Sequence, residues 1–283
     1  MKLDLVMWAK NGAETLGIVL NRINRVVPGK VVNQRLLVDD CSVDDTVRIA
    51  ESFGWRVFSN EGKGIGDGAN TALKRVETEY FCSFEQDILL SPSWWSRISR
   101  LILGKDDVAA ACGLRFLPKN NLFFNIVPYR LTRRNVDYFG GFGKTLDNTI
   151  WNTAILRGLG GFPKLKYGSI DTYLWNLIDA KGYRWMVDYD VQSLHLRPGL
   201  FGELKHWYFY GLSLPESNKR LSLFNSAYQD PGRLYYFLKF AKSPATSFRM
   251  SLKMRDVRLL FAYPAVSFYS FMCYLKGKSL GDS

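Results

Sequence analysis

The sequence predicts an α/β fold, with a mostly parallel, Rossmann-like sheet that has helices on both faces, followed by a helical C-terminal extension. Short apolar runs alternate with amphipathic segments over residues 1–115, which is typical of such a sheet. Aromatic and basic residues dominate beyond residue 216, which predicts the extension. The 283 residues, 47% of them hydrophobic, are enough to bury a core.

Five short apolar runs predict the strands of the first half. Each is bounded by polar or glycine residues, as expected for strands that are buried on both faces. In chain order these strands are expected over 3–9, 35–38, 55–59, 80–84 and 108–112.

Apolar residues at helical spacing predict a helix after each of the first four strands. The second helix is expected to begin at Ser42, because acidic residues fill its first turn. A glycine-rich turn over 62–68 is expected to precede the third. The four helices are expected over 14–27, from 42 onward, over 69–76 and from Pro92 to 103.

The second half of the region is less regular. Residues 116–140 show no clear period, whereas a helix is expected over 171–180 and a strand over 184–187. We therefore predict a first domain over 1–215, with halves at 1–115 and 116–215, and the extension over 216–283.

Polar clusters follow four of the predicted strands: Asn11 with Glu14, Asp39 with Asp40, Lys63 with Gly64, and Glu85 with Asp87. Ligands bind beyond the carboxyl ends of the strands in such sheets, so the clusters predict one shared site.

Each cluster suits a particular ligand group. Glu85 and Asp87 can hold Mg²⁺ or Mn²⁺, which use few protein carboxylates and take phosphate oxygens as further ligands. Asp39 can accept from a nucleobase N–H or a ribose hydroxyl. Lys63 can meet a phosphate. A plain acidic turn and a helix N-cap are the structural alternatives for the acidic clusters.

Several function classes are excluded by missing motifs. The chain lacks GxxxxGK[ST] and has no dinucleotide fingerprint after its first strand, which disfavours kinases and NAD-dependent dehydrogenases. Its four cysteines lie far apart, so neither a zinc site nor a disulfide framework is expected. The N-terminal residues lack a signal-peptide pattern, and we expect a cytoplasmic protein.

Four segments carry a resemblance to a known family. They are LVDDCSVDDT at 37–46, GKGIGDGANTALKRV at 62–76, EYFCSFEQDILLSPSWW at 79–95 and LRGLGGFPKLKYGSIDTYLWNLIDAKGYR at 156–184. In this order and spacing, over about residues 3–200, the chain resembles the inverting glycosyltransferases of family 2, which have the GT-A fold.

The resemblance implies a role for each matched residue. Asp171 would be the catalytic base, and Asp87, Glu85 and His195 would bind Mg²⁺ or Mn²⁺. The nucleotide sugar would be bound by Ala9, Asn11, Glu14, Asp39, Asp40, Lys63, Gly64, Asn70, Gln86 and Arg197.

Two positions depart from the family pattern. Glu85 stands where the first Asp of the metal-binding DxD is usual, and Ile170 replaces an acidic residue before Asp171.

The resemblance also implies a reaction. A sugar would move by single displacement from a UDP- or GDP-linked donor to a glycan or lipid-linked acceptor of the cell envelope. Such a displacement needs one base, one cation and one nucleotide pocket, and no nucleophile triad. The 1–115 half would bind the nucleotide sugar and the 116–215 half the acceptor.

The extension contains 17 uncharged residues over 259–275, fewer than the roughly 20 that a spanning helix needs, and includes Pro264. We therefore expect an interfacial or packing element. Rings and cations over 230–278 suit peripheral contact with anionic lipid on the cytoplasmic side of the membrane. Packing on the sheet or an oligomer contact is the alternative.

Two other functions fit these features less well. A nucleotidyltransferase on a related sheet should have a basic, glycine-rich segment near the N-terminus, and WAKNGAE lacks it. The net charge of +12 also suits a nucleic-acid-binding protein, but residues 201–283 carry 12 Lys/Arg against 5 Asp/Glu. Because +7 of the charge lies in the extension, we expect no nucleic-acid partner.

Overall fold

The computed structural model describes residues 2–116, 144–164, 170–196, 208, 211–212, 215, 219–220, 222 and 232–281. These residues fall into two compact units, each described by itself here. The first contains the described residues up to 196, and the second contains those that follow.

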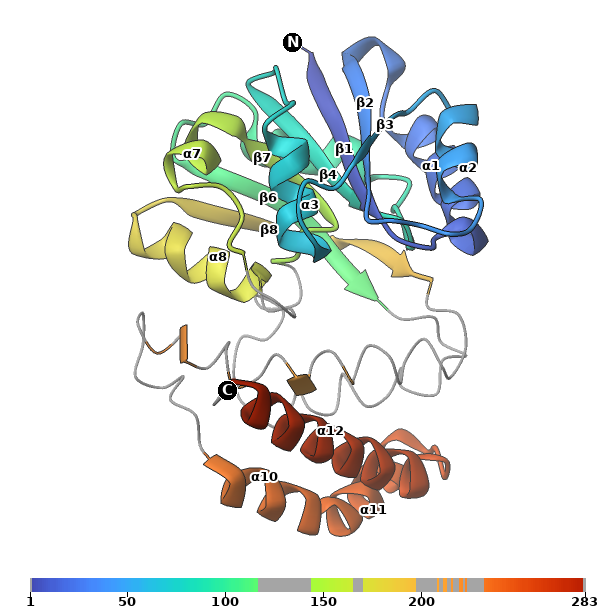
Figure 1. Ribbon diagram of the computed structural model, residues 1–283, viewed down its shortest axis with the longest axis vertical. Coiled ribbons are helices and arrows are strands. Elements are labelled where there is room, and N and C mark those ends of the chain that lie inside the picture. Colours follow the sequence, from blue (N-terminus) through green and yellow to red (C-terminus); the bar gives the residue numbers. More distant parts are fainter. Residues whose placement is uncertain are drawn as a thin grey trace. The chain divides into compact units, whose positions relative to one another are not determined.

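A mixed sheet forms the centre of the first unit, with the strand order β3-β2-β1-β4-β7-β6-β8-β5 (Figure 1). The strands are β1 (Leu3–Ala9), β2 (Val32–Asp39), β3 (Arg56–Ser59), β4 (Tyr80–Glu85), β5 (Ile88–Leu89), β6 (Val108–Phe116), β7 (Asn148–Asn152) and β8 (Arg184–His195). Strands β1 to β4 are parallel, as are β6 and β8. The predicted α/β fold with a mostly parallel sheet is therefore confirmed.

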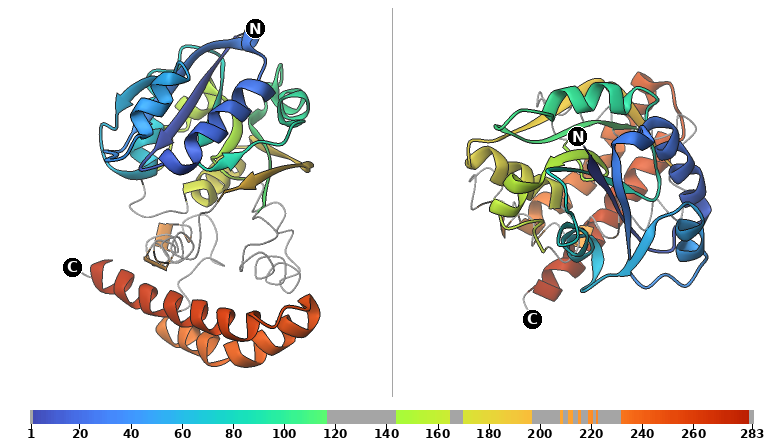
Figure 2. Two further views of the ribbon diagram at one scale, coloured as in Figure 1. Left: turned by 90° about the vertical axis from the view of Figure 1, so that its right-hand side faces the viewer. Right: turned by 90° about the horizontal axis from the view of Figure 1, so that it is seen from above.

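Helices cover both faces of this sheet (Figures 1 and 2). Buried residues of α1 and α4 join one core with Leu5 and Met7 of β1, whereas α3 packs beside Trp8, whose side chain points to the other face. The helices of the unit are α1 (Ala13–Val26), α2 (Thr46–Ser52), α3 (Gly64–Leu73), α4 (Trp94–Ile102), α7 (Thr153–Gly158) and α8 (Ile170–Ala180), with a 3₁₀ turn at Gly29–Val31.

The glycine-rich segment differs from the prediction. Most of the expected turn is helical, because α3 begins at Gly64. A Cβ on Gly66 would lie 2.7 Å from the Pro163 carbonyl oxygen, and one on Gly68 would lie 3.3 Å from Trp8 Cβ. These glycines therefore let the helix pack closely on its neighbours.

Two further elements differ from the prediction. Helix α2 begins at Thr46 rather than at Ser42, whose Oγ instead accepts a hydrogen bond from the Asn11 amide at 2.8 Å. Strand β7 was not predicted, and it runs antiparallel between β4 and β6. Its five residues are all buried, so the alternation that marks a half-exposed strand is absent.

Three helices form the described core of the second unit: α10 (Gly232–Ala241), α11 (Ser243–Met254) and α12 (Leu259–Gly281). Both α10 and α11 pack against α12 (Figure 2). Aromatic pairs join them, with ring centroids 4.1 Å apart for Tyr236 and Tyr274. The predicted helical extension is confirmed. Within the described part of the chain, no helix has the length and hydropathy needed to cross a bilayer.

Candidate functional site

Several of the predicted site residues lie at the carboxyl edge of the sheet. Strands β2 and β4 lie on either side of β1, where Ala9 pairs with Asp39 and Trp8 pairs with Glu85. Since neighbouring strands are about 4.8 Å apart, the two acidic positions are separated by about 10 Å across β1. The backbone of Ala9 accepts from the Asp40 amide at 2.9 Å, which joins the ends of β1 and β2.

Asp39 has one carboxylate oxygen that the protein leaves without a partner. Its Oδ2 accepts from the Ser42 amide at 3.0 Å, whereas Oδ1 is buried and has no hydrogen bond. Buried acceptors almost always have a hydrogen-bond partner, so the unpartnered Oδ1 of Asp39 is suited to accept a hydrogen bond from an N–H or O–H group of a ligand.

Asp40 joins three segments of the edge. Its carboxylate accepts from Asn60 Nδ2 at 2.8 Å, Lys10 Nζ at 3.2 Å and the Gly64 amide at 3.3 Å. Burial raises the pKa of Asp40, but these donors outweigh it and hold the pKa below its usual value. Gly64 has φ +79, so this contact uses a backbone conformation that glycine adopts readily.

The first loop is held by residues that were predicted to bind the donor. Asn11, with φ +50, accepts at Oδ1 from the Val43 amide at 2.9 Å. Gln86 accepts from the Lys10 amide at 2.8 Å and donates to the Lys10 carbonyl at 3.1 Å. Both amide ends of Gln86 are thus engaged by the chain, and its contact with a donor stays a prediction.

Glu14 and Lys63 are both exposed at the start of a helix. Glu14 lies in the first turn of α1, and Lys63 immediately precedes α3. The Lys63 amide donates to Asp67 at 3.1 Å, which secures the turn that precedes the helix. Their contacts with a nucleotide sugar stay predictions.

Asp87 and His195 lie in direct contact, although 108 residues separate them in the chain. His195 Nε2 lies 2.9 Å from Asp87 Oδ2, and the His195 residue is only 5% exposed. The antiparallel pairing of β5 with β8 places them, because Ile88 pairs with His195 and the Leu196 amide donates to the Asp87 carbonyl at 2.7 Å. An imidazole and a carboxylate together suit a divalent cation.

Glu85 lies at the end of β4. Burial and the negative charges of Asp147 and Asp87 raise the pKa of Glu85 to about 8. No group of three acidic, histidine or cysteine side chains arranged to hold a metal ion occurs among the described residues. The role of Glu85 as a third protein ligand therefore stays a prediction.

Arg115 and Asp147 belong to the same charged cluster as Glu85, and neither was predicted from the sequence. Arg115 Nη1 lies 2.5 Å from Asp147 Oδ2, and the Asp147 side chain is 1% exposed. Asp147 also accepts from Thr145 Oγ1 and Asn148 Nδ2 at 2.9 and 2.7 Å. The polar pair Asp147-Asn148, shortly before Ile150 and Trp151, was the signal available in the sequence.

Asp171 lies in the first turn of α8, where its Oδ1 accepts from the Thr172 amide at 2.8 Å. Burial raises the pKa of Asp171, and the positive charge of Arg115 opposes that rise. A carboxylate with a raised pKa is a better proton acceptor than an exposed one, which suits a general base.

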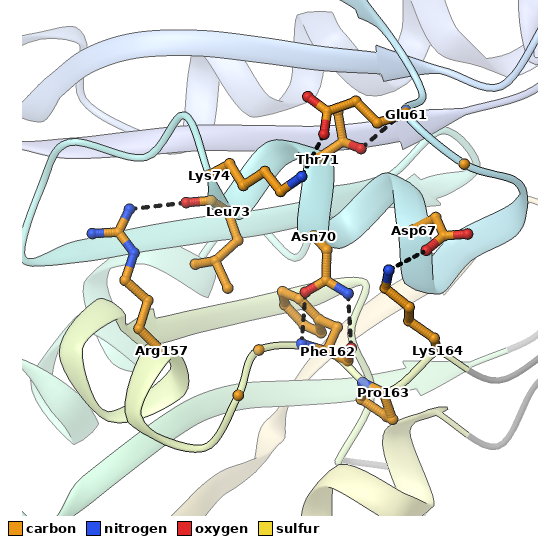
Figure 3. A pocket seen from close by; sticks show the side chains of 13 residues that line it. Glu61, Asp67, Asn70, Thr71, Leu73, Lys74, Arg157, Phe162, Pro163 and Lys164 are labelled. Carbon is orange, nitrogen blue, oxygen red and sulfur yellow. Dashed lines mark hydrogen bonds and ion pairs between the residues drawn. The ribbon is translucent and has the colours of Figure 1, made fainter.

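A pocket of about 650 Å³ lies between α3 and residues 157–164 (Figure 3). Of the described residues that line it, Asn70 alone was predicted to bind the donor. Asn70 Nδ2 donates to the Gly66 and Phe162 carbonyls, and its Oδ1 accepts from the Phe162 amide. Asn70 thus ties α3 to the Gly-Gly-Phe segment, and its donor contact stays a prediction. Arg197 lies outside the described residues.

Comparison with known proteins identifies the family. The model of "Glycosyl transferase family 2" matches residues 4–158, more than half of the chain.

The chain belongs to glycosyl transferase family 2.

Solved structures of glycosyltransferases share its GT-A fold. A mannosyltransferase from Pyrobaculum calidifontis is 15% identical, with a TM-score of 0.65 over 97% of this chain and 87% of that one. Glucosyl-3-phosphoglycerate synthase from Mycobacterium tuberculosis is 16% identical, with a TM-score of 0.56 over 77% and 79%. TarS from S. aureus is 15% identical, with a TM-score of 0.55 over 99% and 90%. No curated protein sequence matches the chain.

Proposed function

We propose that this family 2 glycosyltransferase moves a sugar from a nucleoside diphosphate donor, UDP- or GDP-linked, to a hydroxyl of a glycan or lipid-linked acceptor by a single inverting displacement. The contact between Asp87 and His195 carries the proposal, because an imidazole and a carboxylate together suit a divalent cation. The unpartnered Oδ1 of Asp39 supports it, because this oxygen could accept a hydrogen bond from a nucleobase. The Pyrobaculum enzyme was solved with GDP-Man and Mn²⁺, and the Mycobacterium enzyme with UDP and Mn²⁺, which supports this donor class.

The residues at the edge fit a divalent cation. Asp87 and His195 would hold Mn²⁺ or Mg²⁺, with oxygens of the donor diphosphate filling further positions. When bound, the cation supplies positive charge next to the leaving diphosphate.

Each remaining residue has a separate task. Asp39 Oδ1 accepts a hydrogen bond from the nucleobase of the nucleotide sugar and so fixes the orientation of that nucleobase. Asp171 takes the proton from the acceptor hydroxyl as that oxygen attacks the anomeric carbon. The sugar–phosphate bond breaks in the same step, and the nucleoside diphosphate leaves with the bonding electrons. A single displacement of this kind inverts the anomeric configuration.

A thermal-shift screen of UDP-, GDP- and dTDP-sugars, with and without Mn²⁺, tests the donor site, since a bound donor stabilises the folded state. One donor should raise Tm, and more so with Mn²⁺. Asp87→Ala and His195→Ala should abolish the Mn²⁺-dependent part, whereas Asp190→Ala, which removes a 79% exposed side chain on the same strand as His195, should not. No shift with any donor would contradict the proposal.

Transfer itself is tested with the base variant. Asp171→Asn should keep the donor-induced shift and lose turnover by 100-fold or more, the typical contribution of a general base being about 10²–10⁴. Asp179→Asn, at a half-exposed position on the same helix, is the matched control and should retain turnover. Full turnover by Asp171→Asn would refute the base assignment, and a product of retained anomeric configuration by NMR would refute the single displacement.

A further inference from the structure

The three C-terminal helices present an apolar surface on the side of α10 and α11 that faces away from α12. In α10, Tyr236 and Phe240 pack on rings of α12, with centroids 4.1 and 5.2 Å from those of Tyr274 and Phe268. At 100° per residue, Leu234 and Leu238 lie on the opposite side of α10, and both are exposed.

Helix α11 repeats this division. Ser243, Ser247 and Met250 are buried and lie on one side of the helix, whereas Phe248 and Leu252 lie on the other and are 57% and 65% exposed. Because α10 and α11 lie on the same side of α12 and both pack on it (Figures 1 and 2), their far sides share the direction away from it. We name Leu234, Leu238, Phe248 and Leu252 the outer face.

Cations border this face along one side of α11. Lys242, Arg249 and Lys253 flank its apolar side chains and are exposed. Residues 232–281 contain nine Lys/Arg and one acidic residue, Asp256, which accepts two hydrogen bonds from the Arg258 guanidinium at 2.8 Å. The net charge of this segment is therefore +8 out of +12 for the whole chain.

We propose that the outer face docks on the surface of an anionic phospholipid bilayer, with Phe248 and Leu252 entering the interface and the flanking cations meeting lipid phosphates. Exposed apolar side chains bordered by Lys and Arg are the pattern of helices that lie in the membrane plane. A protein partner with a plain apolar surface would leave this charge without complement. Docking does not depend on the proposed transfer reaction.

Sedimentation of the full chain with phosphatidylcholine vesicles, with and without 30% phosphatidylglycerol, tests the proposal without any donor present. Binding should need the anionic lipid and weaken as salt rises, since each cation near such a surface contributes about fivefold. Phe248→Ser with Leu252→Ser should weaken binding at least tenfold, as should Arg249→Glu with Lys253→Glu.

Matched controls come from the first unit. Ile18→Ser with Val43→Ser removes two exposed apolar side chains, and Arg25→Glu with Lys30→Glu reverses two exposed cations. Both should bind vesicles like the parent chain. Three results would overturn the proposal. The first is that the outer-face variants bind vesicles as well as the parent chain does, and the second is that the parent chain does not bind anionic vesicles. The third is that the parent chain self-associates with rising concentration and only the outer-face variants abolish this. Circular dichroism checks folding, and the charge pair remains informative if the apolar pair unfolds.

Discussion

The buried ion pair between Arg115 and Asp147 allows a quantitative test of how the site is held. Replacing Asp147 by Asn removes the charge that faces Arg115 while nearly preserving the volume. Breaking a buried pair typically destabilises by about 3–5 kcal/mol, because one charge stays buried without its partner. The Asp147 side chain is 1% exposed and that of Arg115 is 20% exposed, so we expect the lower end, about 3 kcal/mol.

The chain offers a control pair of the same chemistry. Arg184, at the start of β8, pairs with Asp107, just before β6, at 2.6 Å, but their side chains are 51% and 58% exposed. Water already solvates both groups, so Asp107→Asn should cost less than about 1 kcal/mol.

Thermal unfolding followed by circular dichroism separates the two outcomes. A loss of about 3 kcal/mol should lower Tm by about 6–12 °C in a unit of this size, whereas Asp107→Asn should lower it by at most about 4 °C. Replacing Arg115 by Met in the Asp147→Asn background should recover part of the loss, since the buried guanidinium charge that Asp147 no longer balances is then removed as well. Equal, small shifts for Asp147→Asn and Asp107→Asn would refute the reasoning from burial.

Two further predictions concern close packing and pH. Gly66→Ala should destabilise by about 1–3 kcal/mol in urea unfolding, since its Cβ would lie 2.7 Å from the Pro163 oxygen, whereas Gly158→Ala, with open space, should be neutral or stabilising. Equal changes in the free energy of unfolding for Gly66→Ala and Gly158→Ala would contradict the prediction about close packing. Without added cation, stability should fall as pH rises from about 4.5 to about 8. The native state keeps the Glu85 proton that the unfolded chain releases, which gives a slope of at most about 1.4 kcal/mol per pH unit. Glu85→Gln should flatten that slope, and an unchanged slope in urea titrations at several pH values would refute the assignment.

The sequence alone determined the first part of the sheet. The strand over Leu3–Ala9 has the predicted bounds, and the later strands of the first half lie where their apolar runs predicted, with ends that differ by a few residues. Such runs are local signals, because the side chains of a strand buried on both faces are mostly apolar. Ala9, Asp39 and Glu85 could likewise be placed at one edge, since parallel strands bring their carboxyl ends together.

Only the tertiary structure decided what lies beyond that edge. The antiparallel insertion of β7 between β4 and β6 brings Asp147 to Arg115, and the pairing of β5 with β8 completes the contact of Asp87 with His195. The tertiary structure also shows that Asp39 Oδ1 has no hydrogen-bond partner and that the Pro163 carbonyl oxygen lies close to Gly66. The physical reason is that pairing between distant strands depends on packing and burial summed over the whole unit, which the local apolar period does not encode.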